Sequence, residues 1–197
     1  MLIVHENARL LPHFKDVARR FAKEGFVGLA IDLVSRLGGT TEDAARNMMA
    51  LRAAPAEFVA DVQSGLNYLK TQSFVKANAL GVTGFCFGGG VTFEMAGRSP
   101  DVKAAVPFYG FSTPELQELL TKTKTAVLFF WGDQDRGSAA APTITEKLRA
   151  SGTPSDGKIY PGAQHAFFNE EKPNSYNQAA AQDSWKLMLD WFRKYLV

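Results

Sequence analysis

The amino-acid sequence predicts an α/β fold in which helices flank a mostly parallel central sheet. Strand-like and helix-like segments alternate along all 197 residues. The strand-like segments are continuous apolar runs, which is typical of parallel strands that are covered on both faces. The sequence contains no internal repeat and no linker that would divide it, so we expect residues 1–197 to form one domain.

The first half of the chain begins with an apolar run at residues 1–4, which predicts a strand. Pro12 suits the first turn of a helix, and Gly25 is a typical residue at which such a helix ends. The buried run 26–31 predicts the next strand. The segments expected after it are a loop at 35–41 and helices at about 41–51 and 55–71.

The second half repeats the alternation. Short apolar runs predict four strands, and helix-compatible segments separate them. In the last helix, Trp185, Leu189 and Phe192 follow one another at spacings of four and three, which places them on one face. The expected strands are 79–83, 103–108, 125–131 and 157–160, and the expected helices are 89–97, 114–120, 139–150 and 175–195.

The composition excludes several classes of function. The 22 basic and 20 acidic residues give a formal net charge of +2, without a Lys/Arg-rich run, so we expect no nucleic-acid partner. The apolar runs are too short to span a membrane and no signal peptide is recognisable, so we expect a cytoplasmic protein without a membrane partner. A single cysteine excludes an internal disulfide and a Cys-based zinc cluster, and we expect neither a metal nor an organic cofactor.

That single cysteine, Cys86, is the centre of the run Gly84-Phe85-Cys86-Phe87-Gly88. The run is the G-x-S-x-G pattern of a nucleophile elbow with sulfur in place of the hydroxyl, and it lies between an expected strand and an expected helix. A lone cysteine is otherwise often a buried structural residue. The glycine frame favours a nucleophile, with the backbone N–H of Phe87 as a donor to the oxyanion.

A thiol nucleophile works with a neighbouring base, and the chain has three histidines. His5 ends the first strand, and we expect His13 to face solvent in the first helix. Only His165 follows Cys86, as the order nucleophile, acid, histidine requires. The acid is expected after the strand 125–131, where both Asp133 and Asp135 lie, and we prefer Asp135.

Five segments in this order resemble the dienelactone hydrolase family of α/β-hydrolases. They are His5-Glu6-Asn7, 26–32, 84–89, 131–135 and 162–167. The resemblance implies the α/β-hydrolase fold and a carboxymethylenebutenolidase-like carboxylic ester hydrolase that acts through an acyl-enzyme. It assigns the catalytic triad to Cys86, Asp135 and His165. It also implies that Glu6 contacts the thiol and that the backbone N–H groups of Phe87 and Asn7 form the oxyanion hole.

The sequence departs from this family in two places. Family members usually carry further strands before the His-Glu segment, so we expect a sheet shortened at its N-terminal edge and a monomer or weak homodimer. The family pairs a substrate carboxylate with arginines, but the position four residues after His165 is Asn169, and only Arg46 or Arg52 matches the other arginine. The candidate substrate-binding residues are Arg46, Phe85, Tyr109, Phe167 and Asn169, with Phe87, Phe111 and Phe168 as further candidates for an apolar pocket.

We therefore expect a small-molecule ester or lactone as the substrate. One alternative is a general carboxylesterase or thioesterase that acts on neutral acyl esters, which Asn169 favours. The other is a non-catalytic module that senses oxidants through the Cys86 thiol.

Overall fold

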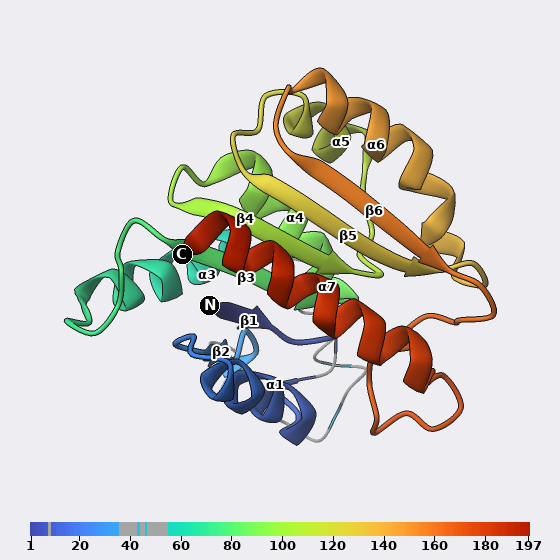
Figure 1. Cartoon of the computed structure of the whole chain (residues 1–197), viewed down its shortest axis with the longest axis horizontal. Coiled ribbons are helices and arrows are strands. Elements are labelled where there is room, and N and C mark those ends of the chain that lie inside the picture. Colours follow the sequence, from blue (N-terminus) through green and yellow to red (C-terminus); the bar gives the residue numbers. More distant parts are fainter. Residues whose placement is uncertain (8, 36–42, 44–45, 47–54) are drawn as a thin grey trace.

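In the described part of the chain, six strands form one parallel sheet in the order β2-β1-β3-β4-β5-β6 (Figure 1). The computed structural model describes residues 1–7, 9–35, 43, 46 and 55–197. The strands are β1 (Leu2–Val4), β2 (Leu29–Ile31), β3 (Leu80–Phe85), β4 (Val102–Phe108), β5 (Ala126–Gly132) and β6 (Ser155–Tyr160). The predicted α/β fold with a mostly parallel sheet is confirmed, and β2 forms the sheet edge next to β1.

Helices connect the strands. They are α1 (Pro12–Lys23), α3 (Pro55–Thr71), α4 (Phe87–Arg98), α5 (Pro114–Leu120), the 3-10 helix η2 (Arg136–Ala140), α6 (Ala141–Ala150) and α7 (Gln178–Leu196). Side chains cap three of these described N-termini, because Thr113 accepts from the N–H of Leu116, Asp135 from that of Gly137 and Asn177 from that of Ala180. Among the described residues, no helix is both long and apolar enough to cross a membrane. The helix expected at 41–51 falls outside the described residues, apart from residues 43 and 46.

The helices cover both faces of the sheet. Thr83 and Gly84 are neighbours on β3, so their side-chain positions point to opposite faces. The Thr83 hydroxyl contacts Met188 of α7, whereas a Cβ on Gly84 would lie against α4. The helix α7 therefore crosses one face, as Figure 1 shows, and α4 lies on the other. The ring of Phe21 in α1 packs 4.9 Å from Trp185, which places α1 beside α7.

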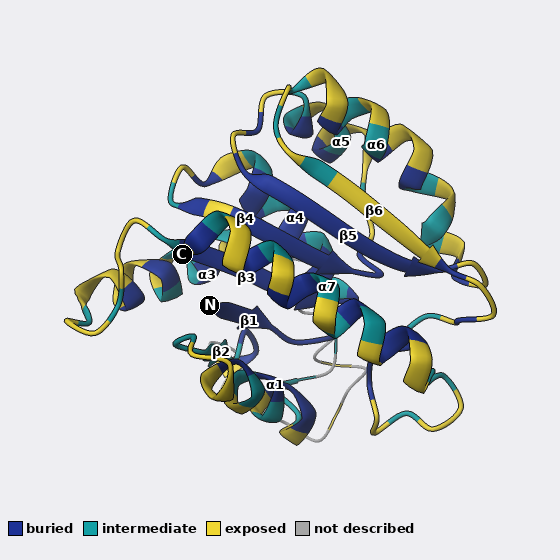
Figure 2. Ribbon diagram, viewed as in Figure 1, coloured by how far each residue is buried: buried dark blue, intermediate teal, exposed yellow. Residues whose placement is uncertain are grey.

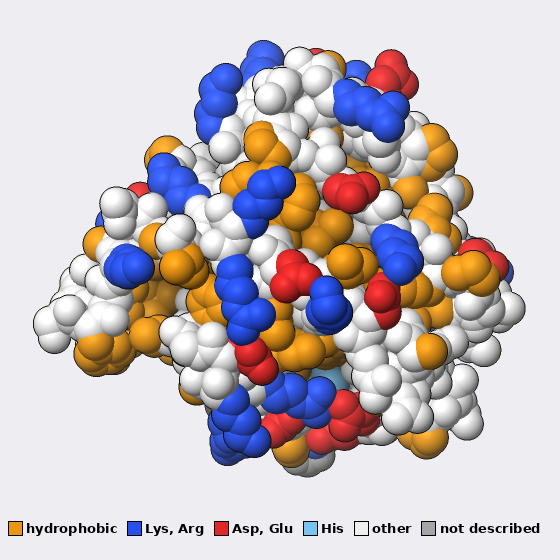
Figure 3. All heavy atoms as spheres, viewed as in Figure 1, with side chains coloured by type: hydrophobic (Ala, Val, Ile, Leu, Met, Phe, Trp, Pro, Cys, Tyr) orange, Lys and Arg blue, Asp and Glu red, His pale blue; other side chains and the backbone are white. Residues whose placement is uncertain are grey.

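Burial falls from the centre of the sheet to its edge (Figure 2). Strands β3 and β5 are buried along their full length, and β4 is buried except at Lys103, whereas most of β6 is exposed. On the face shown in Figure 3, side chains of Lys and Arg lie interspersed with those of Asp and Glu. This mixture agrees with the nearly balanced composition.

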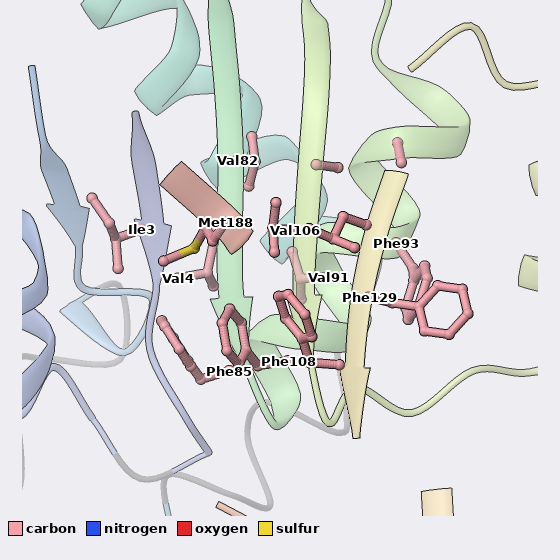
Figure 4. Close-up of a cluster of buried hydrophobic side chains, with 14 of the residues drawn as sticks. Ile3, Val4, Val82, Phe85, Val91, Phe93, Val106, Phe108, Phe129 and Met188 are labelled. Carbon is pink, nitrogen blue, oxygen red and sulfur yellow. The ribbon is translucent and has the colours of Figure 1, made fainter. Parts of the chain in front are cut away.

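A cluster of aromatic rings lies beneath the carboxyl ends of the central strands. Phe85 of β3 and Phe108 of β4 are fully buried, with ring centroids 4.9 Å apart (Figure 4). Phe168 stacks on Phe85 at 5.2 Å and so joins the loop after β6 to the same cluster. These rings form an apolar floor under the turns that follow the strands.

The expected boundaries differ most at β2. The run from Phe26 predicts a strand, but β2 begins only at Leu29. Instead, the N–H of Phe26 donates to the carbonyl of Phe21, which completes the turn after α1. The Phe26 ring then packs on Phe21 at 6.0 Å. Phe26 is therefore apolar because it packs against α1, and not because it belongs to a strand.

Candidate active site

The polar side chains singled out by the sequence meet at the carboxyl edge of the sheet. Glu6 follows β1, Cys86 follows β3, Tyr109 follows β4, Asp135 follows β5 and His165 follows β6. Because all these strands are parallel, their carboxyl ends open onto the same edge. This edge is the usual location of ligand sites in open α/β sheets.

Cys86 occupies a strained turn between β3 and α4, with φ +56° and ψ −112°. Positive φ is uncommon for a residue other than glycine. The two glycines of the motif are required because the backbone approaches itself closely. A Cβ on Gly84 would lie 2.2 Å from the carbonyl oxygen of Gly88, and a Cβ on Gly88 would lie 2.5 Å from that of Val4.

Backbone strain is concentrated around this turn. In the described residues, the non-glycine residues with positive φ are Cys86, Tyr109 (+37°) and Ala166 (+66°). Tyr109 directly follows β4, and Ala166 directly follows His165. Strain of this kind persists only where the surrounding structure over-determines the backbone, and it gathers at functional sites.

The Cys86 side chain is nearly covered, with 7% of the residue exposed. Its N–H donates to the carbonyl of Phe108 at 3.1 Å, and its carbonyl accepts from the N–H of Gly90 at 3.1 Å, so both backbone groups hold the turn. Phe87 is the first residue of α4, and the N–H groups of a first turn have no partner within the helix. The oxyanion-hole roles of Phe87 and Asn7 stay predictions.

Asp135 orients His165. The Nδ1 atom of His165 lies 2.7 Å from Oδ2 of Asp135, a buried carboxylate, while Oδ1 accepts from the N–H of Gly137 at 2.8 Å. Asp133, the alternative that the sequence leaves open, is exposed, and its Oδ1 accepts from the N–H of Gly162 at 2.9 Å. The contact to the imidazole therefore comes from Asp135.

The electrostatic surroundings of His165 favour its protonated form. Burial lowers the pKa, but the hydrogen bond to Asp135 and the neighbouring Cys86 sulfur outweigh burial and raise the pKa of His165 to about 10. Two aromatic rings enclose the imidazole, since Phe111 stacks on it at 5.7 Å and Tyr109 lies 5.0 Å from it. A protonated imidazole beside a thiolate is the arrangement that an activated cysteine requires.

Glu6 is the other buried carboxylate of the site, with 2% of the residue exposed. The hydroxyl of Tyr109 and the amide of Asn169 each donate to it at 3.3 Å, and the ammonium group of Lys172 forms an ion pair with it. Among the described residues no hydrogen bond joins Glu6 to Cys86, and the expected contact between Glu6 and the thiol stays a prediction.

Sequence reasoning missed Lys172. The backbone N–H of Lys172 donates to the carbonyl of Asn169, and the loop thereby turns the ammonium group towards Glu6. A cation thus lies near the position where Asn169 replaces an arginine of the resembled family. In the sequence, the only indication of this cation is that Lys172 lies three residues after Asn169, and the sequence does not show where the side chains of that loop point.

His5 fixes the backbone that carries Glu6. Its Nδ1–H donates to the carbonyl of Glu6, and its Nε2 accepts from the N–H of Leu33 at 3.0 Å. Burial lowers the pKa of His5, and this pair of bonds requires the neutral ring. His5 is therefore a structural residue of the site.

The expectation that His13 faces solvent is wrong. The residue is 4% exposed and its ring packs edge-on against Phe14, Phe85 and Phe168. Its position in the first turn of α1 faces the sheet, because the helix lies across the aromatic cluster. Burial lowers the pKa of His13, which favours the neutral ring in this apolar surrounding.

The candidate substrate-binding residues do not form one group. Phe85 and Phe167 are fully buried, so they belong to the core and do not line a pocket. Tyr109 and Asn169 are also buried, and both bind Glu6. Arg46 is exposed, and its backbone N–H donates to Asp43. Arg52 lies outside the described residues.

The aromatic residues that do line a cavity are Phe87 and Phe111. Phe87 follows Cys86 in the chain, and Phe111 stacks on the imidazole of His165, so two lining residues of this cavity adjoin the site. Within the described ranges, no cluster of three or more His, Cys, Asp or Glu side chains has the arrangement of a metal site.

Comparison with known proteins agrees with this geometry. The dienelactone hydrolase family matches residues 1–196. A protein of Methylorubrum extorquens, provisionally named a carboxymethylenebutenolidase, is 34% identical over 211 residues, which cover 100% of this chain and 72% of that protein. A crystal structure from Klebsiella pneumoniae, provisionally assigned as a dienelactone hydrolase, is 29% identical with a TM-score of 0.88 and covers 98% of this chain and 86% of its own.

The fold extends to more distant enzymes. An α/β hydrolase from a deep-sea metagenome library has a TM-score of 0.72 at 16% identity, over 99% of this chain and 84% of its own. At that identity the likeness concerns the fold alone. The α/β-hydrolase fold expected from the sequence is confirmed.

Proposed function

Because this chain belongs to the dienelactone hydrolase family, we propose that it hydrolyses a carboxylic ester or lactone through a cysteine acyl-enzyme. The observation that carries the proposal is the position of Cys86 at a strained strand-to-helix turn beside the His165–Asp135 pair. A structural cysteine needs neither the turn nor the pair. The substrate is a small molecule.

The first half of the reaction transfers the acyl group to sulfur. The Cys86 thiolate attacks the carbonyl carbon, a C–S bond forms, and the carbonyl π electrons move onto oxygen. Backbone N–H groups of Phe87 and Asn7 stabilise that oxyanion. When the intermediate collapses, the C–O bond breaks and His165 gives its proton to the leaving oxygen.

The second half returns the thiol. The neutral His165 takes a proton from water, and the hydroxide attacks the thioester carbonyl. The C–S bond breaks, and the electron pair returns to sulfur as the thiolate while His165 keeps the proton. Asp135 holds the imidazole in one tautomer and stabilises its charge throughout.

The test combines kinetics with intact-protein mass spectrometry. We expect wild type mixed with p-nitrophenyl acetate to show a burst of one nitrophenolate and to gain one acetyl group on Cys86. Cys86→Ala is expected to lose turnover by about 10⁴-fold or more. Wild-type turnover in Cys86→Ala, with a wild-type circular dichroism spectrum, would show that the thiol is not the nucleophile.

A further inference from the structure

An apolar groove leaves the candidate active site along one face of α4. It has a volume of about 600 Å³ and is lined mainly by apolar side chains. From α4 these are Phe87 and Val91, from α3 Val59, and from α5 Leu116. The groove therefore lies between three helices on the face of the sheet opposite α7.

The α4 residues that line the groove show in which direction the groove runs. Phe87, Gly90, Val91, Glu94 and Arg98 follow one another at intervals of three, one, three and four residues, which places them on one stripe of the helix. Gly90, which also lines the groove, has no side chain, and a Cβ there would lie 3.1 Å from the carbonyl oxygen of Phe111. A continuous apolar path thus runs from the start of α4 along the helix.

Two of the residues that line the groove adjoin the reacting groups. Phe87 directly follows Cys86 in the chain, and Phe111 stacks on the imidazole of His165. Phe111 is 59% exposed, which is unusual for a large apolar ring. An acyl group bonded to the Cys86 sulfur therefore has an apolar surface immediately beside it.

A polar pair ends the apolar path. Glu94 and Arg98 form an ion pair at 2.5 Å across one turn of α4. From Phe87 to Glu94 the helix advances about 10 Å, at about 1.5 Å per residue. An extended chain advances about 1.2 Å per bond, as the peptide backbone does, so about eight carbon atoms fill that distance.

We propose that this groove binds the acyl chain of the substrate, an ester with an unbranched apolar acyl group of up to about eight carbons. The inference rests on the proposed function, because the chain must be attached to Cys86 to lie along α4. It favours neutral acyl esters over a small anionic lactone. The leaving alcohol departs past His165, outside the groove.

The test measures kcat/KM for p-nitrophenyl esters from acetate to decanoate. Full burial of one methylene group raises kcat/KM by up to about fourfold. In a groove that is open to solvent on one side, we expect about threefold per methylene. We expect kcat/KM to rise on the order of 100-fold from acetate to hexanoate. The rise should end near octanoate, because decanoate reaches the Glu94–Arg98 pair.

Val59→Trp fills the groove from α3. We expect this variant to lose the gain in kcat/KM from acetate to hexanoate, because the indole occupies the space of the acyl chain. Ala60→Trp places the same indole on the exposed side of the same helix, and it should behave as wild type. If Val59→Trp does not fold by circular dichroism, Val59→Phe takes its place.

Three results would overturn this inference and leave the proposed function intact. They are acetate turnover that depends on Cys86 with no gain from longer acyl chains, a gain that persists in the folded Val59 variant, and a gain along acetate esters of longer alcohols instead. Wild-type turnover in Cys86→Ala is a different result, because it contradicts the proposed function itself.

Discussion

Replacement of Asp135 by asparagine isolates the contribution of one buried charge. Asparagine has the same shape, and its Oδ1 still accepts the N–H of Gly137, so the loop after β5 keeps its bond. The other branch changes from a carboxylate to an amide that donates. The amide N–H of this branch would donate to Nδ1 of His165, so the ring proton would sit on Nε2. In that tautomer Nε2 cannot accept the Cys86 proton.

The size of the effect follows from two terms. A charge-assisted hydrogen bond is worth about 1.5–3 kcal/mol, and no solvent screening reduces it here, because the Asp135 side chain is 3% exposed. The unfavourable tautomer adds a comparable cost. Together they predict a loss of about 10²–10⁴-fold in kcat/KM, at about 1.4 kcal/mol per factor of ten.

The assay is hydrolysis of p-nitrophenyl acetate by Asp135→Asn, with Asp133→Asn as the matched control. Asp133 lies two residues away and is exposed, so its replacement should change kcat/KM by less than about threefold. If Asp133→Asn loses the activity and Asp135→Asn keeps it, the reasoning about the acid is refuted. Equal losses in both variants would also refute it.

Two further predictions concern the charges of the site. We expect the imidazole of His165 in the resting protein to titrate near pH 10 by NMR, and to titrate lower in Cys86→Ala; a wild-type midpoint near 6.5 would contradict the proposed ion pair. Because the folded-state pKa is raised, this pairing stabilises the fold fully below about pH 6.5, and its contribution is lost as pH rises through about 10. For Lys172→Met we expect urea denaturation to show a loss of about 1–2 kcal/mol, since Glu6 stays buried without its cation. Lys186→Met, which breaks an exposed pair with Asp190, should cost less, and equal losses would argue against a special role for Lys172.

Local patterns were sufficient for most of the fold. The strand-to-helix turn at Cys86 was predicted because glycines at fixed spacing reflect a close backbone approach. The helices beginning at Pro12 and Pro55 were predicted because proline suits a first turn. In each case the physical cause lies within a few residues of the feature.

Contacts between distant segments were not predictable in the same way. The ion pair between Glu6 and Lys172 joins the loop after β1 to the loop after β6, and no periodicity encodes that approach. His13 illustrates the same limit, since a polar residue at a helix start suggests solvent exposure. Its burial depends on Phe85 and Phe168, which reach it only after the sheet forms.

The strand order also bears on how the protein is made. β1 carries Glu6 and pairs with β3, and Leu2 lies beside Val82 in that register. A ribosome adds about 5–20 residues per second, so this three-residue apolar strand waits several seconds for β3, although β2 emerges sooner on its other side. Pairing between strands so far apart in the chain is slow, and the edge of β1 that faces β3 stays unpaired meanwhile. Assembly of the sheet edge that carries both Glu6 and Cys86 is thus a late event in synthesis.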